Sequence, residues 1–451
     1  VANAEQDRVP LIVLSGMVDP ATAMTYTHQV FDHSAAMRTV CKASYRAAPG
    51  GVEAMMAKAL RLARSGRPGP VHIDLPIAVA AAEEPEGPLP ADPAALGAPA
   101  GPGVAAAHAL FAASMRPVIV AGLDAVNEPG APEAIRAFAE RHSVPVVTTY
   151  KAKGILPEDH PLSLWGHGLS PKSDAVVLPV LREADCVIAA GYDPIEMRPG
   201  WRAPWEPARC IEFAHAPNDH DMHHAGLSWI STVAGGLAML DEGVAAPKPG
   251  WDHAPCRRAL EAAFAPRAEW GPDVALSELV AAIPAEAVTS VDSGAHRILM
   301  SQLPFCRRTR ALIQSTGLCT MGCALPLALG HRIADPARPA IAVMGDGCAE
   351  MVLGELATVR DSGEPLVVVV LADRSLALIE LKQRREGKQN AGVDYAGRTD
   401  FVGLAALFGG VGVRVSGPGE AGSALHEALG RTDRFTLIEV EIPRRAYDGL
   451  I

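Results

Sequence analysis

The chain has 451 residues, of which 49% are hydrophobic, and a formal net charge of −11. This length and apolar content can support two or three hydrophobic cores, so we expect a multidomain globular protein. A negative net charge without a Lys/Arg block disfavours nucleic acid and membranes as partners, and no apolar run approaches the roughly 20 residues that cross a bilayer. Eight scattered cysteines without a Cys-x-x-Cys pair are typical of reduced thiols. Together, the charge, the lack of a membrane-crossing run and the cysteine pattern predict a cytoplasmic protein.

Two stretches rich in Pro, Gly and Ala, at residues 83–103 and 242–256, divide the sequence. Such composition interrupts helices and central strands, so both are predicted linkers. They separate segments 1–82, 104–241 and 257–451. The first segment is small for an independent α/β domain, and we expect it to be half of one.

Short apolar runs alternate with helical periodicity in all three segments. In chain order the runs are 11–14 and 71–75, 118–121 and 186–190, and 340–344 and 366–372. Continuous apolar runs predict strands buried on both faces, which is typical of parallel sheets covered by helices. The predicted fold class is therefore α/β, with three doubly wound parallel-sheet domains of which the first is incomplete.

The third segment has the most informative order of elements. Residues 340–344 predict a strand, Gly345-Asp346-Gly347 a tight turn, and residues from Cys348 a single amphipathic helix that ends at Gly363. A second strand at 366–372 follows and would lie parallel to the first after a right-handed crossover. The two carboxylates that follow these strands, Asp346 and Asp373, would then meet at the same edge of the sheet.

The residues around Asp346 suit a metal-bridged diphosphate. The flanking glycines allow a ligand to approach the backbone, and the N-terminus of the following helix offers free N–H groups to an anion. Mg²⁺ prefers oxygen ligands and binds through one or two carboxylates together with phosphate oxygens and water. Taken alone, Gly-Asp-Gly more often marks an ordinary turn.

Gly-Asp-Gly followed at this distance by an acidic or amide side chain after an apolar strand resembles the signature of thiamine diphosphate-dependent enzymes. The resemblance implies that Asp346, Asp373 and the backbone carbonyl of Ser375 bind Mg²⁺. Ala372-Asp373 stands where the family has Asn-Asn, and Asp keeps an oxygen ligand while adding negative charge.

Further motifs extend the resemblance over essentially the whole chain. Residues 315–326 are similar to the family's Gly-Leu-Gly-Thr-Met-Gly-x-Gly-Leu-Pro segment, which implies that Met321 wedges between the two cofactor rings rather than only filling a core. Residues 292–296 resemble the opening diphosphate contact, with His296 beside a phosphate or in a structural role. The implied cofactor-binding residues are Gly294, Ala295, His296, Cys319, Met321, Asp346, Gly347, Cys348, Asp373, Leu376, Leu378 and Ile379.

The first two segments resemble the pyrimidine-binding and central domains of the acetolactate synthase family. Residues 10–16 and 69–76 match the second half of the pyrimidine-binding domain, in which Gln29 is either an active-site contributor or a surface helix glutamine. The central domain carries FAD in some relatives, but Gly122-Leu123-Asp124 lacks a Gly-x-Gly-x-x-Gly fingerprint, so the sequence does not predict FAD.

The family's cofactor-activating glutamate is expected in the first half of the pyrimidine-binding domain, which precedes Val1, and neither Glu5 nor Glu53 lies in its motif. Three explanations stay open: a truncated sequence, which we favour, a separate subunit that supplies the half-domain, or an inactive relative.

The resemblance implies decarboxylation of a pyruvate-like 2-oxo acid and transfer of the activated aldehyde to an acceptor, as in acetolactate synthase. A decarboxylase without ligation and a non-catalytic cofactor-binding subunit are the alternatives. Lys382 replaces a tryptophan of the acetohydroxyacid synthases, and Lys382, Arg384 and Arg385 either meet an anionic substrate group or form a solvated face, which we favour. Because the family's cofactor sites lie between subunits, we expect a homodimer or homotetramer.

Overall fold

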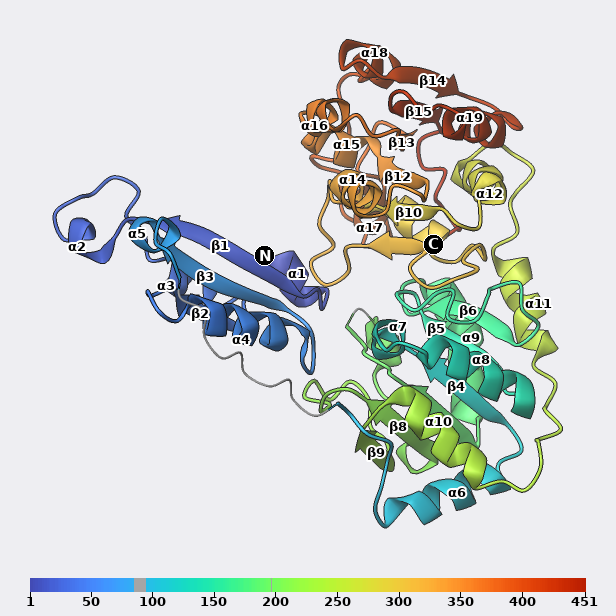
Figure 1. Cartoon of the computed structure of the whole chain (residues 1–451). Coiled ribbons are helices and arrows are strands. Elements are labelled where there is room, and N and C mark those ends of the chain that lie inside the picture. The colour runs from blue at the N-terminus through green and yellow to red at the C-terminus, as the bar shows by residue number, and fades with distance from the viewer. Residues whose placement is uncertain (85–94, 196) are drawn as a thin grey trace. The chain divides into compact units, whose positions relative to one another are not determined.

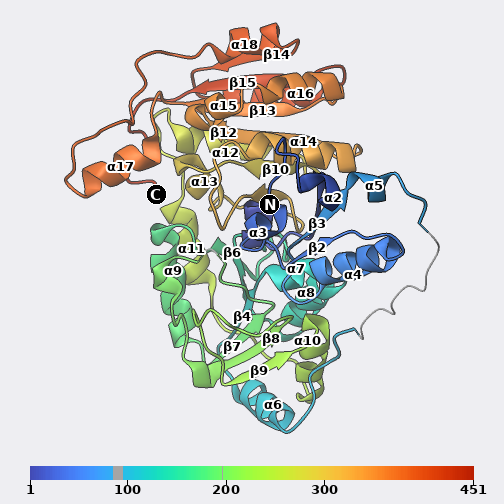
Figure 2. The ribbon, with the colours of Figure 1, turned by 90° about the vertical axis from the view of Figure 1, so that its left-hand side faces the viewer.

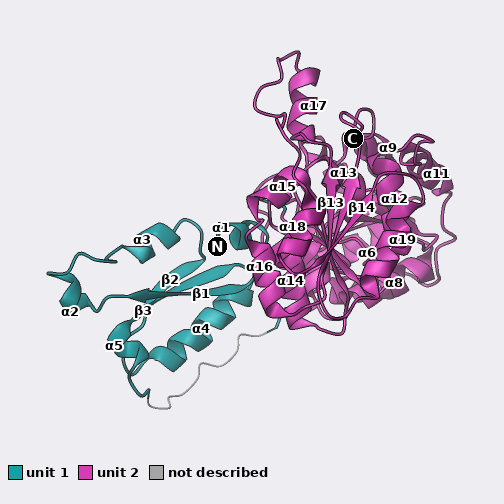
Figure 3. Cartoon of the chain, turned by 90° about the horizontal axis from the view of Figure 1, so that it is seen from above, with its two compact units in different colours: residues 1–96, 316–318 teal, residues 97–315, 319–451 magenta. Residues whose placement is uncertain are grey.

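The computed structural model describes residues 1–84, 95–195 and 197–451. The chain divides into two compact units (Figures 1 and 3): unit 1 comprises residues 1–96 and 316–318, and unit 2 comprises residues 97–315 and 319–451. Most of the linker predicted at 83–103 lies outside the described residues. In the described part of the chain, no helix combines the length and apolar character that a membrane span requires.

Unit 1 contains a three-stranded parallel sheet in the order β1-β3-β2. Its elements are α1 (Ala2–Gln6), β1 (Leu11–Met17), α2 (Pro20–Ala23), α3 (His33–Met37), β2 (Ala43–Arg46), α4 (Val52–Arg64), β3 (Pro70–Pro76) and α5 (Ile77–Ala80). The central strand β3 is almost fully buried. The prediction of burial on both faces is wrong for β1, where Leu14 is 58% exposed, because this edge strand has a single strand neighbour and buries little of its surface.

Polar side chains fix the loops of unit 1. Lys42 Nζ donates to the carbonyl oxygens of Leu62 and Ser65 at 2.6 Å and of Arg67 at 2.9 Å, and thereby caps the C-terminal end of α4. The backbone N–H groups of Thr316 and Gly317 donate to Asp7 Oδ1 at 2.9 and 3.1 Å. These bonds hold the segment 316–318 within the unit.

The first sheet of unit 2 has six parallel strands in the order β6-β5-β4-β7-β8-β9. Its elements are α6 (Gly103–Ala113), β4 (Pro117–Ala121), α7 (Leu123–Asn127), α8 (Ala131–His142), β5 (Val146–Thr149), β6 (Ser163–His167), α9 (Pro171–Glu183), β7 (Cys186–Ala190), the 3₁₀ helices η1 (Pro199–Trp201) and η2 (Pro207–Arg209), β8 (Cys210–Ala214), β9 (Leu227–Ile230) and α10 (Val233–Glu242). Val118 and Val120 pack into one apolar cluster, and Ile119 and Ala121 into the other. This alternation confirms burial on both faces.

The second sheet of unit 2 also has six parallel strands, in the order β11-β10-β12-β13-β15-β14. Its elements are α11 (Ala254–Ala263), α12 (Pro272–Ala282), β10 (Val288–Val291), α13 (Ala295–Met300), β11 (Leu312–Gln314), α14 (Ala324–Ala334), β12 (Ala340–Gly345), α15 (Asp346–Met351), α16 (Glu355–Ser362), β13 (Val367–Ala372), α17 (Ala377–Arg385), α18 (Phe401–Leu407), β14 (Val411–Val415), α19 (Glu420–Leu429) and β15 (Thr436–Glu441). Helix α11 begins inside the linker predicted at 242–256. Three parallel sheets confirm the predicted α/β class, whereas the domain boundaries stay a prediction.

The single helix predicted after Gly347 is wrong in one respect, because it is broken in two. Helix α15 starts at Asp346 and ends at Met351, and α16 follows after a turn at 352–354. In that turn Val352 N donates to the Ala349 carbonyl and Glu355 N to the Val352 carbonyl. Gly354, which has a low helix propensity, lies at this break.

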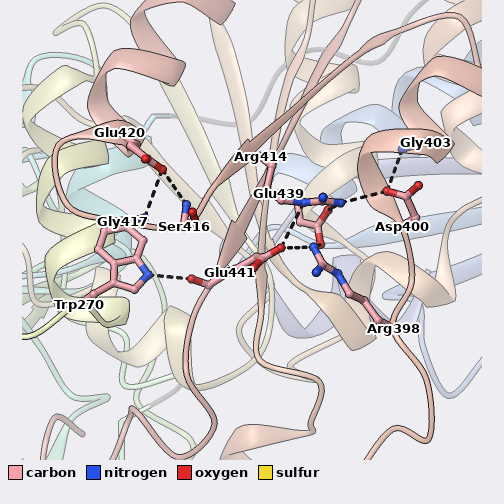
Figure 4. Close-up of polar contacts among 10 residues, drawn as sticks. All are labelled: Trp270, Arg398, Asp400, Gly403, Arg414, Ser416, Gly417, Glu420, Glu439 and Glu441. Atoms are coloured by element: carbon pink, nitrogen blue, oxygen red, sulfur yellow. Dashed lines mark hydrogen bonds and ion pairs between the residues drawn. The ribbon is translucent and has the colours of Figure 1, made fainter.

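The strand β15 contains a buried carboxylate that two arginines neutralise (Figure 4). Glu439 is fully buried, and its oxygens accept from Arg398 at 2.8 Å and from Arg414 at 3.2 Å. Both arginines also pair with Glu441, and Arg414 pairs with Asp400 at 3.2 Å. This network links β14, β15 and the segment before α18.

Candidate cofactor site

A crevice opens at the carboxyl ends of β10 and β12, where the connections of the second sheet of unit 2 diverge. Strand β10 is followed in sequence by β11 on one side, whereas β12 lies on its other side, and ligands of parallel α/β sheets bind at such a point. Figure 2 labels α13 and α15, the helices that follow β10 and β12. The residues that line the crevice are Ser293, Gly294, Ala295, His296, Met321, Gly345, Asp346, Gly347, Cys348, Leu371, Asp373, Ser375, Leu376, Ala377, Leu378, Ile379 and Tyr447.

The crevice brings together all of the cofactor-binding residues expected from the sequence except Cys319, and also the expected metal ligand Ser375. Its walls come from four separate parts of the chain: the segment after β10, the loop of Met321, the β12–α15 turn and the segment after β13. Tyr447, from the segment after β15, completes the wall.

Asp346 and Asp373 both lie where the sequence predicts, at the ends of two hydrogen-bonded parallel strands. The register pairs Gly345 of β12 with Leu371 of β13. Each carboxylate is only 5% exposed. Asp346 Oδ2 accepts from Arg374 N at 2.7 Å and its Oδ1 from Gly347 N at 2.8 Å, so the backbone after each strand fixes this side chain.

The electrostatics of the two carboxylates favour a bound cation. Burial raises the pKa of Asp346 to about 6, and burial together with the negative charge of Asp346 raises the pKa of Asp373 to about 7. A divalent ion would relieve both penalties. Ser375, the third expected ligand, is 6% exposed in the turn that follows, and its N–H donates to Asp373 Oδ1 at 3.1 Å.

The ligand chemistry fits Mg²⁺ bound together with a diphosphate. Among the described residues, no group of three or more His, Cys, Asp and Glu side chains could hold a metal ion. Two carboxylates therefore leave coordination positions for a backbone carbonyl, phosphate oxygens and water, which is how Mg²⁺ is usually bound. The assignment of Asp346, Asp373 and Ser375 as its ligands stays a prediction.

The segment at residues 393–395 holds the turn after β13 in place. Arg374 has a left-handed backbone with φ of +59°. Leu376 N donates to the Val393 carbonyl at 2.8 Å, and Tyr395 N donates to the Arg374 carbonyl at 3.2 Å. The Tyr395 hydroxyl lies against Gly347, where a Cβ would approach it to 2.1 Å. Sequence reasoning has no signal for Tyr395, because this contact forms only in the folded chain.

His296 lies in the crevice wall as an uncharged side chain. It is 4% exposed, and burial, with a smaller contribution from Arg297, lowers its pKa to about 3. Its Nε2 atom is buried without a hydrogen-bond partner in the described structure. Gly294, with φ of +152°, approaches the ring so closely that a Cβ would lie 2.6 Å from it. A neutral imidazole with an unused nitrogen suits a neighbouring ligand oxygen, but the phosphate contact of His296 stays a prediction.

A buried carboxylate of the motif at residues 292–296, whose structural role was not predicted from the sequence, holds the Met321 loop. Asp292 Oδ1 accepts from Gly322 N at 3.0 Å and from Ser293 N at 2.8 Å. Gly322 has φ of +82°, which favours glycine, and it follows the half-buried Met321 directly. Asp292 therefore joins the two segments that carry the expected diphosphate and ring contacts.

Cys319 does not line the crevice. It is exposed, has φ of +50°, and stands at a position where the resembled motif has glycine. Arg297 Nη2 donates to its Sγ at 3.2 Å. The prediction that Cys319 binds the cofactor therefore has no support from the lining of the crevice.

Gln29 and the charged residues of α17 have different surroundings. Gln29 is exposed in a turn between α2 and α3, so the expectation of a helical position is wrong, while its active-site role stays a prediction. Lys382 is exposed. Arg384 bonds to Asp448 at 2.6 and 2.9 Å and to Glu380 at 2.8 Å, so it is engaged in ion pairs rather than simply solvated.

At the switch point of the central sheet, between the ends of β4 and β7, the backbone is closely packed. A Cβ on Gly122 would come within 2.5 Å of the Gly191 carbonyl oxygen, which leaves little room there for the diphosphate of FAD. Glu128 accepts from the N–H groups of Val233 and Ala234 at 2.7 and 2.9 Å, so the chain's own carboxylate occupies the N-terminus of α10. A second anion there would be repelled.

Comparison with protein families places the chain in one class. Residues 104–240 match the central domain of thiamine pyrophosphate enzymes, and residues 292–440 match their C-terminal TPP binding domain, which contains the crevice. The chain therefore belongs to the thiamine pyrophosphate (thiamine diphosphate) enzymes, as the motifs predict.

Within that class it is acetolactate synthase-like. It is 28% identical to the acetolactate synthase isozyme 1 large subunit of Escherichia coli (strain K12), over 96% of this chain and 78% of that protein. Acetolactate synthases of Mycobacterium leprae (27% identical, 97% of this chain, 73% of that protein) and Bacillus subtilis (26%, 95% and 76%) are similar over comparable spans.

Proposed function

We propose that this chain binds thiamine diphosphate with Mg²⁺ and uses it to decarboxylate a pyruvate-like 2-oxo acid and transfer the two-carbon unit to an acceptor, in an acetolactate synthase-like reaction. The proposal rests on one observation above all. Two buried carboxylates with raised pKa values, Asp346 and Asp373, lie at the ends of adjacent strands in a crevice within the match to the TPP binding domain.

The residues of the crevice wall contact different parts of the cofactor in this proposal. Asp346, Asp373 and the Ser375 carbonyl bind Mg²⁺ on the diphosphate, and His296 donates a hydrogen bond to a phosphate oxygen. Met321, on the loop that Asp292 holds through Gly322, would pack against the rings of the cofactor. When bound, the cofactor supplies the carbon nucleophile and electron sink for breaking the bond between the carboxylate and carbonyl carbons.

The apolar residues of α17 shape the reaction space. Leu376, Leu378 and Ile379 line the crevice beside the expected metal ligands. Apolar walls exclude water, which favours transfer to a carbonyl acceptor over simple protonation. We therefore assign the reaction to the transferases rather than to the decarboxylating lyases.

The proposal includes an assembly and a location. Relatives named as large subunits of acetolactate synthase suggest a complex of more than one chain, and we propose a homodimer or homotetramer as its core, in the cytoplasm. Light scattering on the purified protein tests the assembly, and a monomer would contradict it.

The function is tested in two steps. Calorimetry with thiamine diphosphate and Mg²⁺ should show saturable binding that D346A removes, whereas heat equal in the two proteins would contradict the site. With pyruvate added, release of CO₂ with acetolactate supports the proposal, and release of CO₂ with acetaldehyde alone would replace it with a decarboxylase. Tight cofactor binding without any CO₂ would replace it with a cofactor-binding subunit.

A further inference from the structure

Tyr447 brings a phenol hydroxyl to the wall of the cofactor crevice. The residue lies in the turns that follow β15 and is only 4% exposed. Its ring belongs to the same apolar cluster as Leu371 of β13, two residues before the expected metal ligand Asp373. Among the described residues, its hydroxyl has no hydrogen-bond partner. The hydroxyl is therefore available to a ligand in the crevice.

Two other tyrosines show what distinguishes this hydroxyl. Tyr150 and Tyr192 are 1% and 3% exposed, and their hydroxyls are enclosed in the described structure without a hydrogen-bond partner. The hydroxyl of Tyr447 also has no partner, but it is not enclosed, because the residue lines the crevice. An unbonded hydroxyl that reaches a crevice can donate to a ligand there, whereas an enclosed one cannot.

The turns that contain Tyr447 are bonded to α17 on both sides of this residue. Arg445 Nε donates to the buried Glu380 at 2.9 Å. Arg384 donates from its two terminal nitrogens to the two carboxylate oxygens of Asp448 at 2.6 and 2.9 Å. Arg445 has a left-handed backbone with φ of +61°, which a residue other than glycine keeps where its surroundings hold it. These contacts fix Tyr447 in the crevice wall.

The ligand that suits this hydroxyl is an anion bound beside the two carboxylates of the crevice. Burial and the negative charges of Asp373 and Asp346 raise the pKa of Tyr447 above its usual value, so the phenol is a hydrogen-bond donor at neutral pH. The influence of both carboxylates agrees with a position near the expected metal site. A Mg²⁺ ion on these carboxylates would carry diphosphate oxygens, which are strong acceptors.

We propose that Tyr447 is a further cofactor-binding residue, whose hydroxyl donates a hydrogen bond to an oxygen of the metal-bound diphosphate. The inference rests on the proposed function and adds a residue that lies outside the motifs of the crevice. Asp448 is a positioning residue for this contact, because its two bonds with Arg384 hold the turn that contains Tyr447.

The test titrates two probes into the full chain by calorimetry: thiamine diphosphate with Mg²⁺, and inorganic pyrophosphate with Mg²⁺. Y447F should weaken both about tenfold, because a hydrogen bond to a charged group contributes that much. Y192F removes an unpartnered hydroxyl that does not line the crevice, and this matched control should bind both probes like the wild type. Affinity of Y447F within twofold of the wild type for either probe overturns the inference.

Urea unfolding separates a binding role of Tyr447 from a structural one. Because the hydroxyl forms no bond within the described chain, cofactor-free Y447F should have the same midpoint as the wild type or a higher one. Equal concentrations of thiamine diphosphate and Mg²⁺ should then raise the midpoint of Y447F less than that of the wild type. A lower midpoint for cofactor-free Y447F would mean that the hydroxyl stabilises the fold, and would overturn the inference.

A double-mutant cycle tests the positioning role of Asp448. D448N should weaken thiamine diphosphate binding about threefold in the wild type and should have no further effect in Y447F. D433N, which changes the exposed carboxylate paired with Arg434 at 2.6 Å, is the control and should leave the affinity unchanged. Equal effects of D448N in both backgrounds would contradict positioning through Tyr447.

The two proposals fail separately. If the wild type and Y447F bind thiamine diphosphate equally, the inference about Tyr447 fails alone. If the wild type binds neither probe, both proposals fail. Tyr447-dependent binding of pyrophosphate by a chain that does not bind thiamine diphosphate leaves the diphosphate contact standing and contradicts the proposed function.

Discussion

The substitution D373N tests the electrostatic account of the crevice most sharply. Asp373 is buried beside Asp346, and its pKa is raised from its usual 3.8 to about 7, first by burial and then by the Asp346 charge. A carboxyl group with a raised folded-state pKa binds its proton more tightly in the folded chain than in the unfolded chain. Without bound metal, Asp373 therefore does not reduce the free energy of unfolding below about pH 4, where it is protonated. As the pH rises toward 7, ionisation of the buried carboxyl group destabilises the folded chain progressively.

The magnitude follows from the pKa. A rise from 3.8 to about 7 corresponds to a penalty of about 4 kcal/mol, as an upper bound, once the group is fully ionised. Asparagine keeps an oxygen at this position and removes the charge. Metal-free D373N should therefore be more stable than the wild type at pH 8 and similar to it near pH 4, and Mg²⁺ with thiamine diphosphate should stabilise it less than the wild type.

The assay is urea or thermal unfolding in EDTA between pH 4.0 and 8.5, repeated with Mg²⁺ and thiamine diphosphate. D361N, which removes an exposed carboxylate on α16, serves as the control and should follow the wild-type profile. The reasoning is refuted if metal-free D373N unfolds earlier than the wild type at pH 8, or if both proteins show the same pH profile.

Three further predictions concern contacts in and around the site. G347A should reduce cofactor affinity, measured by calorimetry, at least tenfold, because its Cβ would clash with the Tyr395 hydroxyl. Adding Y395F to G347A should restore part of that affinity. E439Q should destabilise the chain by about 3 kcal/mol in urea unfolding by leaving Arg398 and Arg414 without their buried partner, and an unchanged midpoint would contradict this (Figure 4). M321A should lower kcat more than it lowers cofactor affinity, whereas M321L should retain most of the activity. If M321A and M321L have the same kcat, Met321 does not act as a wedge between the cofactor rings.

The sequence predicts the chemistry of the crevice because its main residues follow regular elements. Two apolar runs separated by one helical connection give parallel neighbouring strands, and this alone places Asp346 and Asp373 at one edge. The glycines beside Asp346 and the Met321 motif are also local signals. No comparable signal exists for Tyr395 and Tyr447, which enter the site from irregular segments after α17 and β15.

The remaining errors also have physical causes. The apolar run of β1 predicts burial on both faces, but Leu14 is exposed because neighbours, not the strand itself, decide what is covered. The helical periodicity after Gly347 continues across Gly354, while the helix breaks in the turn at 352–354 that contains this glycine.

The most direct measurement of the central claim is the anomalous diffraction of Mn²⁺ in crystals grown with thiamine diphosphate. The account predicts a single strong peak in the crevice, about 2.2 Å from oxygens of Asp346, Asp373 and Ser375 and in contact with the diphosphate. A cofactor bound with its metal coordinated by other residues, or with no peak between these two carboxylates, would contradict the account.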